Sequence, residues 1–374
     1  MLRVFAEMFP DAPIYTLLYD ERKLGDWFPK DRIRTSRVQR RAELLRYSPC
    51  SILHSAFNHH LHLSRFPAAV EEWDFSGFDL VLSSSSAFTH GIITNSAPRH
   101  LCYVHSPARY LWDRTHDVLE RAGTGLLGPL KRAELSRLFH RLRIWDSESA
   151  DRPDALIAAS EEVRRRIELY WRRASKVIYP PIDDFWFKPP AVSSCGLRVA
   201  GTRNSKLETR DYYLIVSQLA PYKKIDLAVQ ACNQRKANLV IAGEGPAKRS
   251  LEAIAGPTVE FVGYRTDEEL KELYAGARAT LFPGEEDFGL VPLESLACGT
   301  PVIAYRAGGA KETMTDDVAE FFDVPESEFL ADAMERCEKR EWGRSACRRR
   351  AEQFSKHLFV KRMQNAVSRI MASG

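Results

Sequence analysis

The chain has 374 residues, of which 28% are charged and 44% apolar, and 54 basic against 50 acidic residues leave a formal net charge of +4 at pH 7. This composition predicts a globular protein long enough for two domains and excludes a disordered or low-complexity chain. No apolar run approaches the roughly 20 residues that span a bilayer, and the first residues lack the pattern of a signal peptide. The seven scattered cysteines, never spaced C-x-x-C, predict neither a disulfide framework nor a zinc site, so we expect a cytoplasmic setting.

Apolar segments of strand length recur through the first half of the chain, separated by helix-like segments. This alternation predicts a Rossmann-like domain with a parallel sheet over residues 1–190. The expected strands are residues 13–19, 78–85, 100–105, 155–160 and 176–182.

Basic residues gather at Arg32–Arg46 and again at Arg164–Arg173. Such clusters can meet phosphates or anionic lipid, but a solvated face is the favoured interpretation. Aromatic residues are not interleaved with them, so no nucleic-acid partner is expected. Residues 126–146 carry an apolar stripe among arginines, which suits a membrane-surface helix or, as we favour, a helix packed on its own domain.

The second half alternates more regularly, and it predicts a second Rossmann-like domain over residues 191–355 after a linker at 188–210. Thr266 followed by Glu269 is typical of a capping box that starts one helix. A last helix is expected within residues 356–374. The expected strands are residues 211–217, 238–243, 259–263, 279–283 and 301–305.

The segment 283–309, PGEEDFGLVPLESLACGTPVIAYRAGG, is the most informative part of the chain. A buried strand ends at its start, and a glycine turn leads into a helix near Pro292, where a proline suits the first helical turn. We expect backbone N–H groups at the amino end of this helix to converge with the positive end of its dipole, which attracts phosphate. These groups belong to Phe288, Gly289, Leu290 and Val291.

Glu286 and Glu294 bracket this turn in an E-x7-E pattern followed by the CGTPVIA strand and a Gly-Gly turn. The whole string resembles the donor-site signature of retaining glycosyltransferases of family 4. The resemblance implies an α/β protein of the GT-B fold, in which two Rossmann-like domains with parallel sheets face each other across a cleft. It further implies that residues 356–374 cross back to the first domain, that Glu286 lies beside the transferred sugar, and that Glu294 binds the ribose hydroxyls of the nucleotide.

Two further strand-end turns match the same family. Lys223, in the segment SQLAPYKKIDLAVQA, is implied to contact the donor diphosphate and stabilise the departing phosphate. Many relatives have an arginine where this chain has Gln218, so one charge of the usual diphosphate clamp is absent. Gly243 and Gly245, in the turn IAGEGP, are implied to lie near the nucleotide base, although a plain tight turn is an equal alternative.

On the first domain, YVHSPARYLWD (residues 103–113) resembles the acceptor-side loop of bacterial mannosyltransferases in this family. His105 is then expected close to the transferred sugar, and Arg109 and Tyr110 near the acceptor, with a structural role for Tyr110 equally open. Ser85, at another strand end, is assigned to the acceptor side, although helix capping also explains its serine run.

The resemblance implies transfer of a hexose from a nucleotide-sugar donor to a hydroxyl of a glycan or lipid-linked oligosaccharide, with retention and without metal or other cofactor. Mannose from GDP-mannose is the expected donor, with UDP-linked glucose or galactose open, and peripheral association with the cytoplasmic membrane face would suit a lipid-linked acceptor. The alternatives are a catalytically inactive nucleotide-sugar-binding protein, a sugar-nucleotide epimerase and, less favoured, a glycosidase.

The first twenty residues resemble the first helix and second strand of relatives, which usually have a strand and a glycine-rich loop before them. A central strand missing from a Rossmann sheet would leave a gap lined by apolar strands with unpaired backbone groups. A start codon further upstream is the favoured explanation, and a decayed gene the alternative.

Overall fold

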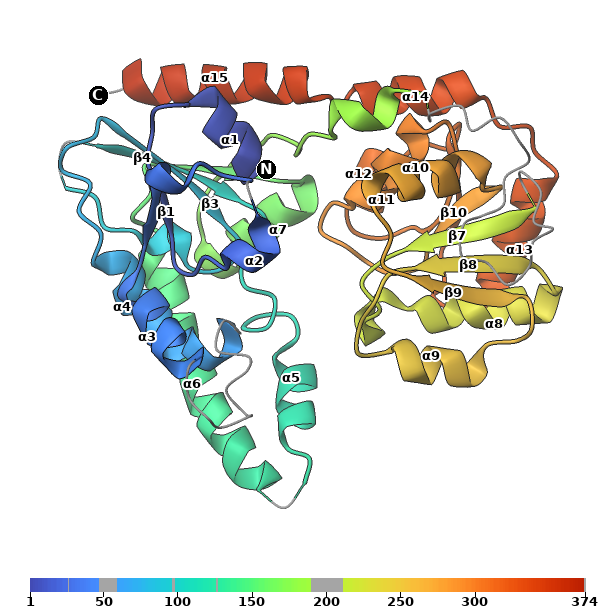
Figure 1. Ribbon diagram of the computed structural model, residues 1–374, viewed down its shortest axis with the longest axis horizontal. Helices are drawn as coiled ribbons and strands as arrows, with labels where there is room; N and C mark the ends of the chain where they lie inside the picture. The colour runs from blue at the N-terminus through green and yellow to red at the C-terminus, as the bar shows by residue number, and fades with distance from the viewer. Residues whose placement is uncertain (26, 47–58, 96–97, 126, 190–210, 373–374) are drawn as a thin grey trace. The chain divides into compact units, whose positions relative to one another are not determined.

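The computed structural model describes residues 1–25, 27–46, 59–95, 98–125, 127–189 and 211–372. They form an N-terminal unit, Met1–Tyr179 with Val360–Gly374, and a C-terminal unit, Pro180–Phe359 (Figure 1). Residues 180–187 belong to the C-terminal unit because they pack on it, with the Trp186 ring edge-on to Tyr274 at 5.7 Å. Most of the predicted linker lies outside the described residues.

The N-terminal unit contains two separate parallel sheets. Four strands lie in the order β3-β4-β5-β6, and β1 pairs only with β2. All five expected strands form part of these sheets, four of them over fewer residues than expected. Strand β2, whose Ile-Arg-Thr sequence contains no apolar run, was not predicted. The strands are β1 (Ile14–Thr16), β2 (Ile33–Thr35), β3 (Leu80–Ser85), β4 (Arg99–Val104), β5 (Ala155–Ala158) and β6 (Lys176–Val177).

Helices surround these two sheets, and the apolar faces of those between residues 37 and 149 form a core with β3. This core is rich in aromatic residues, among them Phe66 and Phe88, whose ring centroids lie 5.1 Å apart. The helices are α1 (Leu2–Met8), α2 (Glu21–Leu24), α3 (Arg37–Arg46), α4 (Phe66–Glu71), α5 (Thr115–Ala122), α6 (Gly128–Ser149), α7 (Glu161–Trp171) and α15 (Lys356–Ala372). Of α15, the part from Val360 onward belongs to the N-terminal unit.

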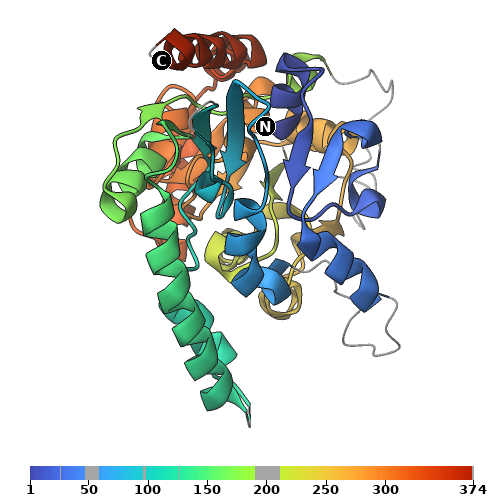
Figure 2. The same ribbon diagram turned by 90° about the vertical axis from the view of Figure 1, so that its left-hand side faces the viewer.

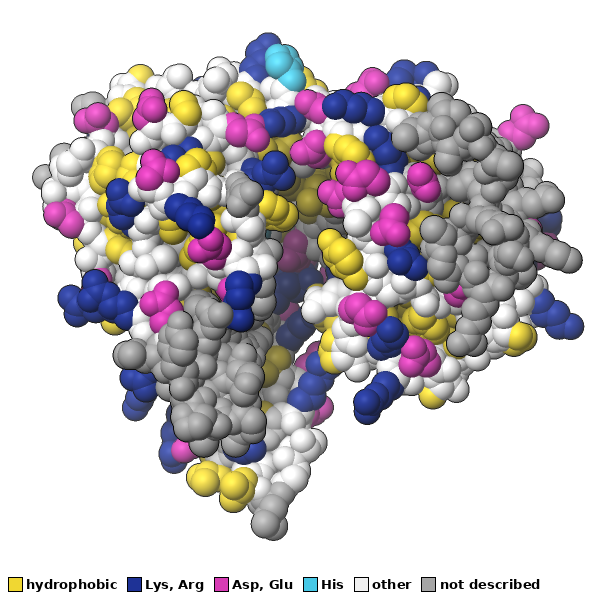
Figure 3. Space-filling model, viewed as in Figure 1, with side chains coloured by type: hydrophobic (Ala, Val, Ile, Leu, Met, Phe, Trp, Pro, Cys, Tyr) yellow, Lys and Arg dark blue, Asp and Glu magenta, His cyan; other side chains and the backbone are white. Residues whose placement is uncertain are grey.

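Helices α5 and α6 form a hairpin that projects from the N-terminal unit (Figure 2). Leu142 is buried and Leu135 and Leu138 pack on the same core, so the second half of α6 packs on its own unit as favoured from the sequence. At the free end, Leu127 and Leu130 are 60% and 61% exposed, and Figure 3 shows hydrophobic atoms there.

One arginine from each of the two basic clusters makes contacts within the N-terminal unit. Arg32 donates from Nε to the Ala12 carbonyl at 2.8 Å and from Nη2 to the Phe9 carbonyl at 2.8 Å. Arg166 lies 3.2 Å from the Asp113 carboxylate and 3.1 Å from Glu162. These contacts tie the chain together, so Arg32 and Arg166 are structural and do not belong to the solvated faces that the sequence favours.

The C-terminal unit is a doubly wound domain built on one six-stranded parallel sheet of order β12-β11-β10-β7-β8-β9. The predicted capping box starts α10, where Thr266 and Glu269 exchange side chain to backbone hydrogen bonds. The strands are β7 (Tyr212–Val216), β8 (Asn238–Ala242), β9 (Val259–Gly263), β10 (Ala279–Phe282), β11 (Val302–Tyr305) and the unpredicted β12 (Ala319–Phe322). The helices are α8 (Ile225–Arg235), α9 (Lys248–Ile254), α10 (Asp267–Gly276), α11 (Leu290–Ala297), α12 (Ala310–Thr313), α13 (Ser327–Glu338) and α14 (Arg344–Glu352).

A cavity of about 660 Å³, here termed the slot, is lined by residues from both sheets of the N-terminal unit. Its walls include all three residues of β1 and most of β3, and α1 contributes Phe5. It lies beside β1, where the sequence predicts a gap. The carbonyls of Asp79, just before β3, and of Ser85, its last residue, accept from the Arg99 and His105 amides on the β4 side. Backbone groups alternate in direction along a strand, so those of Leu80 and Leu82 face the other way, into the slot. Unpaired strand edges of this kind are templates for another strand.

We predict that a strand fused to the amino end of the chain through a short Gly-Ser turn will occupy this slot. About six alternating Val and Ile residues match the length of β3. Pairing with β1 and β3 should raise the melting temperature by at least about 4 °C, which corresponds to roughly 1–2 kcal/mol for a unit of this size. The Leu82 amide should also become protected in hydrogen exchange. A prefix with proline at alternate positions is the control, and equal melting temperatures for both prefixes would contradict the prediction.

Candidate functional site

The carboxyl ends of β7 and β10 mark the topological switch point of the C-terminal sheet. From β7 the sheet continues through β8 and β9 on one side, and through β10, β11 and β12 on the other. In open parallel sheets, ligands bind in the crevice where the connections diverge in this way. Residues 217–224 and 283–289 follow these two strands, so the predicted donor residues Lys223 and Glu286 flank this point.

Glycines allow the loops at this edge to pack backbone against backbone. A Cβ on Gly284 would lie 2.8 Å from the Lys223 carbonyl oxygen, and one on Gly309 would lie 2.4 Å from the Phe288 Cα. Gly308 has a φ of +54°, and the Gly309 amide donates to the Glu286 carbonyl at 2.8 Å. The backbones of the loops after β7, β10 and β11 are therefore in direct contact, which is possible because glycines without side chains occupy the contact positions.

Lys223 and Glu286 form an ion pair across the switch point. Lys223 Nζ donates to Glu286 Oε1, and the side chains are 16% and 23% exposed. Lys223 ends a short 3-10 helix, Pro221–Lys223, and its ammonium lies 5.3 Å from the centre of the Tyr222 ring. The pair places one cation and one carboxylate at a partly solvent-accessible position at the edge of the sheet.

The amino end of α11 is adjacent to this pair. The helix begins at Leu290, with Gly289 as its N-cap at a φ of +85°, and Pro292 lies in its first turn as expected. First-turn N–H groups have no acceptor within a helix, so those of Leu290 and Val291 are available to a ligand. Phe288 is buried and its ring lies 5.8 Å from that of Phe354, so this residue contributes packing as well as backbone.

Glu294 is on the same helix and is bound by a buried tyrosine. Tyr274 donates its hydroxyl to Glu294 Oε2 at 3.0 Å. Burial raises the pKa of Glu294 to about 7, although the Tyr274 hydrogen bond opposes this shift. The carboxyl group is therefore poised between its neutral and ionised forms near neutral pH.

The loops after β7 and β8 form a second close contact. Leu219 donates its amide to the Glu244 carbonyl at 3.0 Å, and Gly243 has a φ of +136° with Ser217 against it. A Cβ on Gly245 would lie 2.4 Å from the Leu219 carbonyl oxygen. Gln218 is exposed between these contacts.

In the N-terminal unit, His105 follows β4 at the carboxyl edge of the four-stranded sheet. Its Nε2 lies 2.8 Å from Ser84 Oγ, and its amide donates to the Ser85 carbonyl at 2.8 Å. Burial lowers the pKa of His105 to about 4, so the imidazole is neutral at pH 7. A neutral imidazole can both donate and accept hydrogen bonds to hydroxyl groups.

The other predicted acceptor-side residues have different surroundings. Arg109 lies 3.8 Å from the Asp113 carboxylate. Tyr110 packs on Phe139, and its buried hydroxyl forms no hydrogen bond with any described residue. Ser85 is fully buried, and its Oγ lies 3.4 Å from His90 Nδ1, so its hydroxyl points into the protein interior.

The sequence did not predict a buried polar cluster that anchors the segment after His105. Two indoles, those of Trp112 and Trp171, donate to the same Asp146 oxygen at 2.8 and 2.7 Å. His90 stacks on Trp171 and lies 3.5 Å from the other Asp146 oxygen. Burial raises the pKa of Asp146 to about 6 and lowers that of His90 to about 3. The only sequence signal for this cluster was a charged residue in the otherwise apolar stripe of α6.

Within the described residues, no group of three His, Cys, Asp or Glu side chains is arranged to hold a metal ion. None of the described helices is both long and apolar enough to cross a membrane.

We predict that Glu294→Gln stabilises the C-terminal unit at pH 8 and has little effect at pH 4. A pKa raised in the folded state means that the stabilising contribution of the protonated group is lost as pH rises through about 7. Removing the charge should therefore raise the free energy of unfolding at pH 8 by about 1–3 kcal/mol. Urea unfolding at the two pH values measures the difference, and a pH-independent effect would show that Glu294 titrates normally.

We predict that Trp112→Phe destabilises the N-terminal unit by about 1–3 kcal/mol, because it leaves the buried Asp146 carboxylate with one donor fewer. The matched control is Trp27→Phe, since Trp27 is 59% exposed and its replacement should cost less than about 1 kcal/mol. Thermal unfolding of both variants tests this, and equal losses would remove the structural role of the indole N–H.

Comparison with known proteins finds a family match within the C-terminal part of the chain. Residues 202–354 match the family Glycosyl transferases group 1. The chain is 40% identical over 139 residues to the GDP-mannose-dependent alpha-(1-6)-phosphatidylinositol dimannoside mannosyltransferase of Mycobacterium tuberculosis, covering 36% of each. It is 32% identical over 165 residues to the D-inositol 3-phosphate glycosyltransferase of Salinispora tropica, covering 38% of this chain and 34% of the relative. These alignments thus span about a third of the curated relatives.

Solved structures share the fold of nearly the whole chain. The Anabaena HepE protein in complex with UDP matches with a TM-score of 0.64 at 18% identity, covering 98% of this chain and 94% of the other. Sucrose-phosphate synthase from Thermosynechococcus elongatus matches with a TM-score of 0.66 at 20% identity, covering 93% and 86%. The two α/β units thus have the GT-B fold that the sequence predicts, and residues 202–354 match the family Glycosyl transferases group 1.

Proposed function

We propose that this protein is a retaining glycosyltransferase that moves a hexose, mannose from GDP-mannose, to a hydroxyl of a glycan or lipid-linked acceptor. The family match over residues 202–354 supports glycosyl transfer, and relatives whose names specify GDP-mannose support this donor. We further propose peripheral association with the cytoplasmic face of a membrane, which would bring the enzyme to a lipid-linked acceptor.

The observation that carries this proposal is the Lys223–Glu286 ion pair at the switch point of the C-terminal sheet. A nucleotide diphosphate placed there would take Lys223 as its counter-charge. The carboxylate of Glu286 would then be released to accept hydrogen bonds from sugar hydroxyls and orient the sugar. In the absence of ligand, each group neutralises the other, so neither charge is left unpaired in a partly buried position.

The α11 amino end supplies the second part of the diphosphate site. Backbone N–H groups of Gly289, Leu290 and Val291, with the helix dipole behind them, would bind phosphate oxygens. Glu294, four residues into the helix, would accept from the ribose hydroxyls in its ionised form. Gly243 and Gly245 would leave room for the base, and exposed Gln218 would offer an uncharged contact.

Catalysis would come from stabilising the charge that builds on the departing diphosphate. Lys223 and the backbone N–H groups are fixed before the reaction, which makes them effective without reorganisation. The leaving phosphate would take the proton of the acceptor hydroxyl, so no side chain is required as base. We expect activity without a divalent metal, which a transfer assay in EDTA tests.

In the N-terminal unit, neutral His105 would hydrogen-bond a hydroxyl of the transferred sugar through the ring nitrogen that Ser84 does not contact. Arg109 and the unpartnered Tyr110 hydroxyl would serve the acceptor. Ser85 would support the site from the interior, because its hydroxyl is committed to His90.

We predict that Lys223→Ala lowers kcat/KM for transfer by about 10²–10³, because it removes one stabilising charge from the leaving group. Glu286→Ala should lower kcat more than donor affinity, and Glu294→Ala should weaken donor binding by about tenfold, the loss of one charge-assisted hydrogen bond. Lys339→Ala, which removes an exposed lysine paired with Glu335, is the control.

Calorimetry with GDP-mannose, UDP-glucose and UDP-galactose identifies the donor. The proposal expects tightest binding of GDP-mannose and turnover only with an acceptor. Binding without turnover would assign a nucleotide-sugar-binding protein instead, and turnover without acceptor would assign an epimerase. Failure of every donor to bind would contradict the donor site itself.

A further inference from the structure

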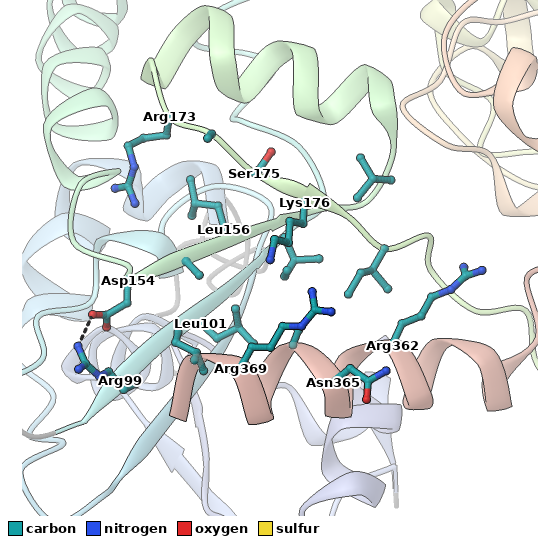
Figure 4. A pocket seen from close by; sticks show the side chains of 17 residues that line it. Arg99, Leu101, Asp154, Leu156, Arg173, Ser175, Lys176, Arg362, Asn365 and Arg369 are labelled. Carbon is teal, nitrogen blue, oxygen red and sulfur yellow. Dashed lines mark hydrogen bonds and ion pairs between the residues drawn. The ribbon is translucent and has the colours of Figure 1, made fainter. Parts of the chain in front are cut away.

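A second cavity lies at the opposite edge of the four-stranded sheet from His105. It has a volume of about 880 Å³ and is enclosed by the amino-terminal ends of β4, β5 and β6 and by α15 (Figure 4). Arg362, Asn365, Arg369 and Ile370 reach it from α15, at the three- and four-residue spacing of one helix face. The proposed transfer chemistry uses none of these residues.

The cavity has an apolar floor and a basic rim. Buried Leu101, Leu156, Ile178 and Ile370 are among the apolar residues that line it. Its volume is in the range of sites that hold small molecules, typically about 300–1,000 Å³. The charged lining residues are five cations and one carboxylate: Arg99, Arg173, Lys176, Arg362, Arg369 and Asp154.

Two of these cations are already satisfied by the protein. Arg99 lies 3.1 Å from Asp154 Oδ1, and the other Asp154 oxygen accepts from the His100 amide at 2.8 Å. Arg173 donates to the Ala150 carbonyl at 2.6 Å and the Pro153 carbonyl at 3.0 Å. The carboxylate in the lining is therefore not available to the remaining cations.

The other three cations have no counter-charge. Lys176, Arg362 and Arg369 form no hydrogen bond or ion pair with any residue that the structure describes, and the Lys176 and Arg369 side chains point toward one another from β6 and α15 (Figure 4). Like charges brought together repel, and a bound anion relieves this repulsion. Ser175, also in the lining, has a buried Oγ without a partner, and such a group costs free energy unless a ligand satisfies it.

We propose that this cavity binds a phosphate monoester or diphosphate carried on an apolar group. The phosphate would lie between Lys176 and Arg369, because a doubly charged anion needs more than one cation and an arginine fork matches phosphate oxygens. Arg362 and the Asn365 amide would add donors at the rim. The apolar group would lie on Leu101 and Leu156, where removing its surface from water would favour binding.

The test uses the full chain and three probes: dodecyl phosphate below its micelle concentration, inorganic pyrophosphate, and vesicles of phosphatidylglycerol against phosphatidylcholine. We expect dodecyl phosphate to bind more tightly than pyrophosphate in calorimetry. Lys176→Gln with Arg369→Gln should weaken binding by at least about tenfold, the effect of losing charge-assisted hydrogen bonds. All four side chains altered in this variant and its control are exposed, so melting temperatures should match the parent.

The matched control is the double variant Lys361→Gln with Arg249→Gln, which removes the same number of positive charges from residues outside the cavity. Lys361 lies on α15, as Arg369 does, so the control also alters that helix. Dodecyl phosphate binding that only the cavity variant weakens assigns a free phosphate amphiphile. Binding to phosphatidylglycerol vesicles that only the cavity variant weakens assigns a membrane lipid. Equal binding by both variants in every arm, or no binding of any probe, would overturn the proposal.

Discussion

Close backbone packing at the carboxyl edge of the C-terminal sheet is the constraint on which the donor site depends. Gly284 and Gly309 occupy positions where a Cβ would collide with neighbouring backbone, and Gly308 has a left-handed conformation. Only because these loops touch can Lys223, which follows β7, reach Glu286, which follows β10. A larger residue at any of these positions would collide with the backbone of Lys223, Glu286 or Phe288.

The charges at this edge are balanced in a way that suits reversible ligand binding. Lys223 and Glu286 neutralise each other, and burial leaves Glu294 near its titration midpoint at neutral pH. A site that holds its own counter-ions avoids the cost of unpaired charge when empty. In the N-terminal unit, the candidate site avoids an unpaired charge because burial lowers the pKa of His105 and leaves its imidazole neutral. The Asp146 cluster holds the segment that follows His105 in place.

Local patterns predicted the elements that make up the site. The capping box at Thr266, the proline in the first turn of α11 and the apolar strands of the C-terminal sheet were recognisable because their signals lie within a few residues. The short strands β2 and β12 were not, because their pairing depends on neighbouring strands rather than on their own sequence. Likewise, Arg32 and Arg166 were readable only as basic clusters, and the partners that fix them are distant or on other elements.

The sequence by itself determined the two-domain α/β organisation, the order of strand-end turns and the candidate donor residues, because hydrophobic periodicity and turn chemistry are local properties. Tertiary structure decided how those residues pair. It brought Lys223 to Glu286 and Tyr274 to Glu294, turned Ser85 inward to His90, and set α15 over the amino ends of β4–β6 to enclose a basic cavity. Apart from Ser85 and His90, which are five positions apart, these contacts join residues tens to hundreds of positions apart, and only the packed sheet and its helices bring them together.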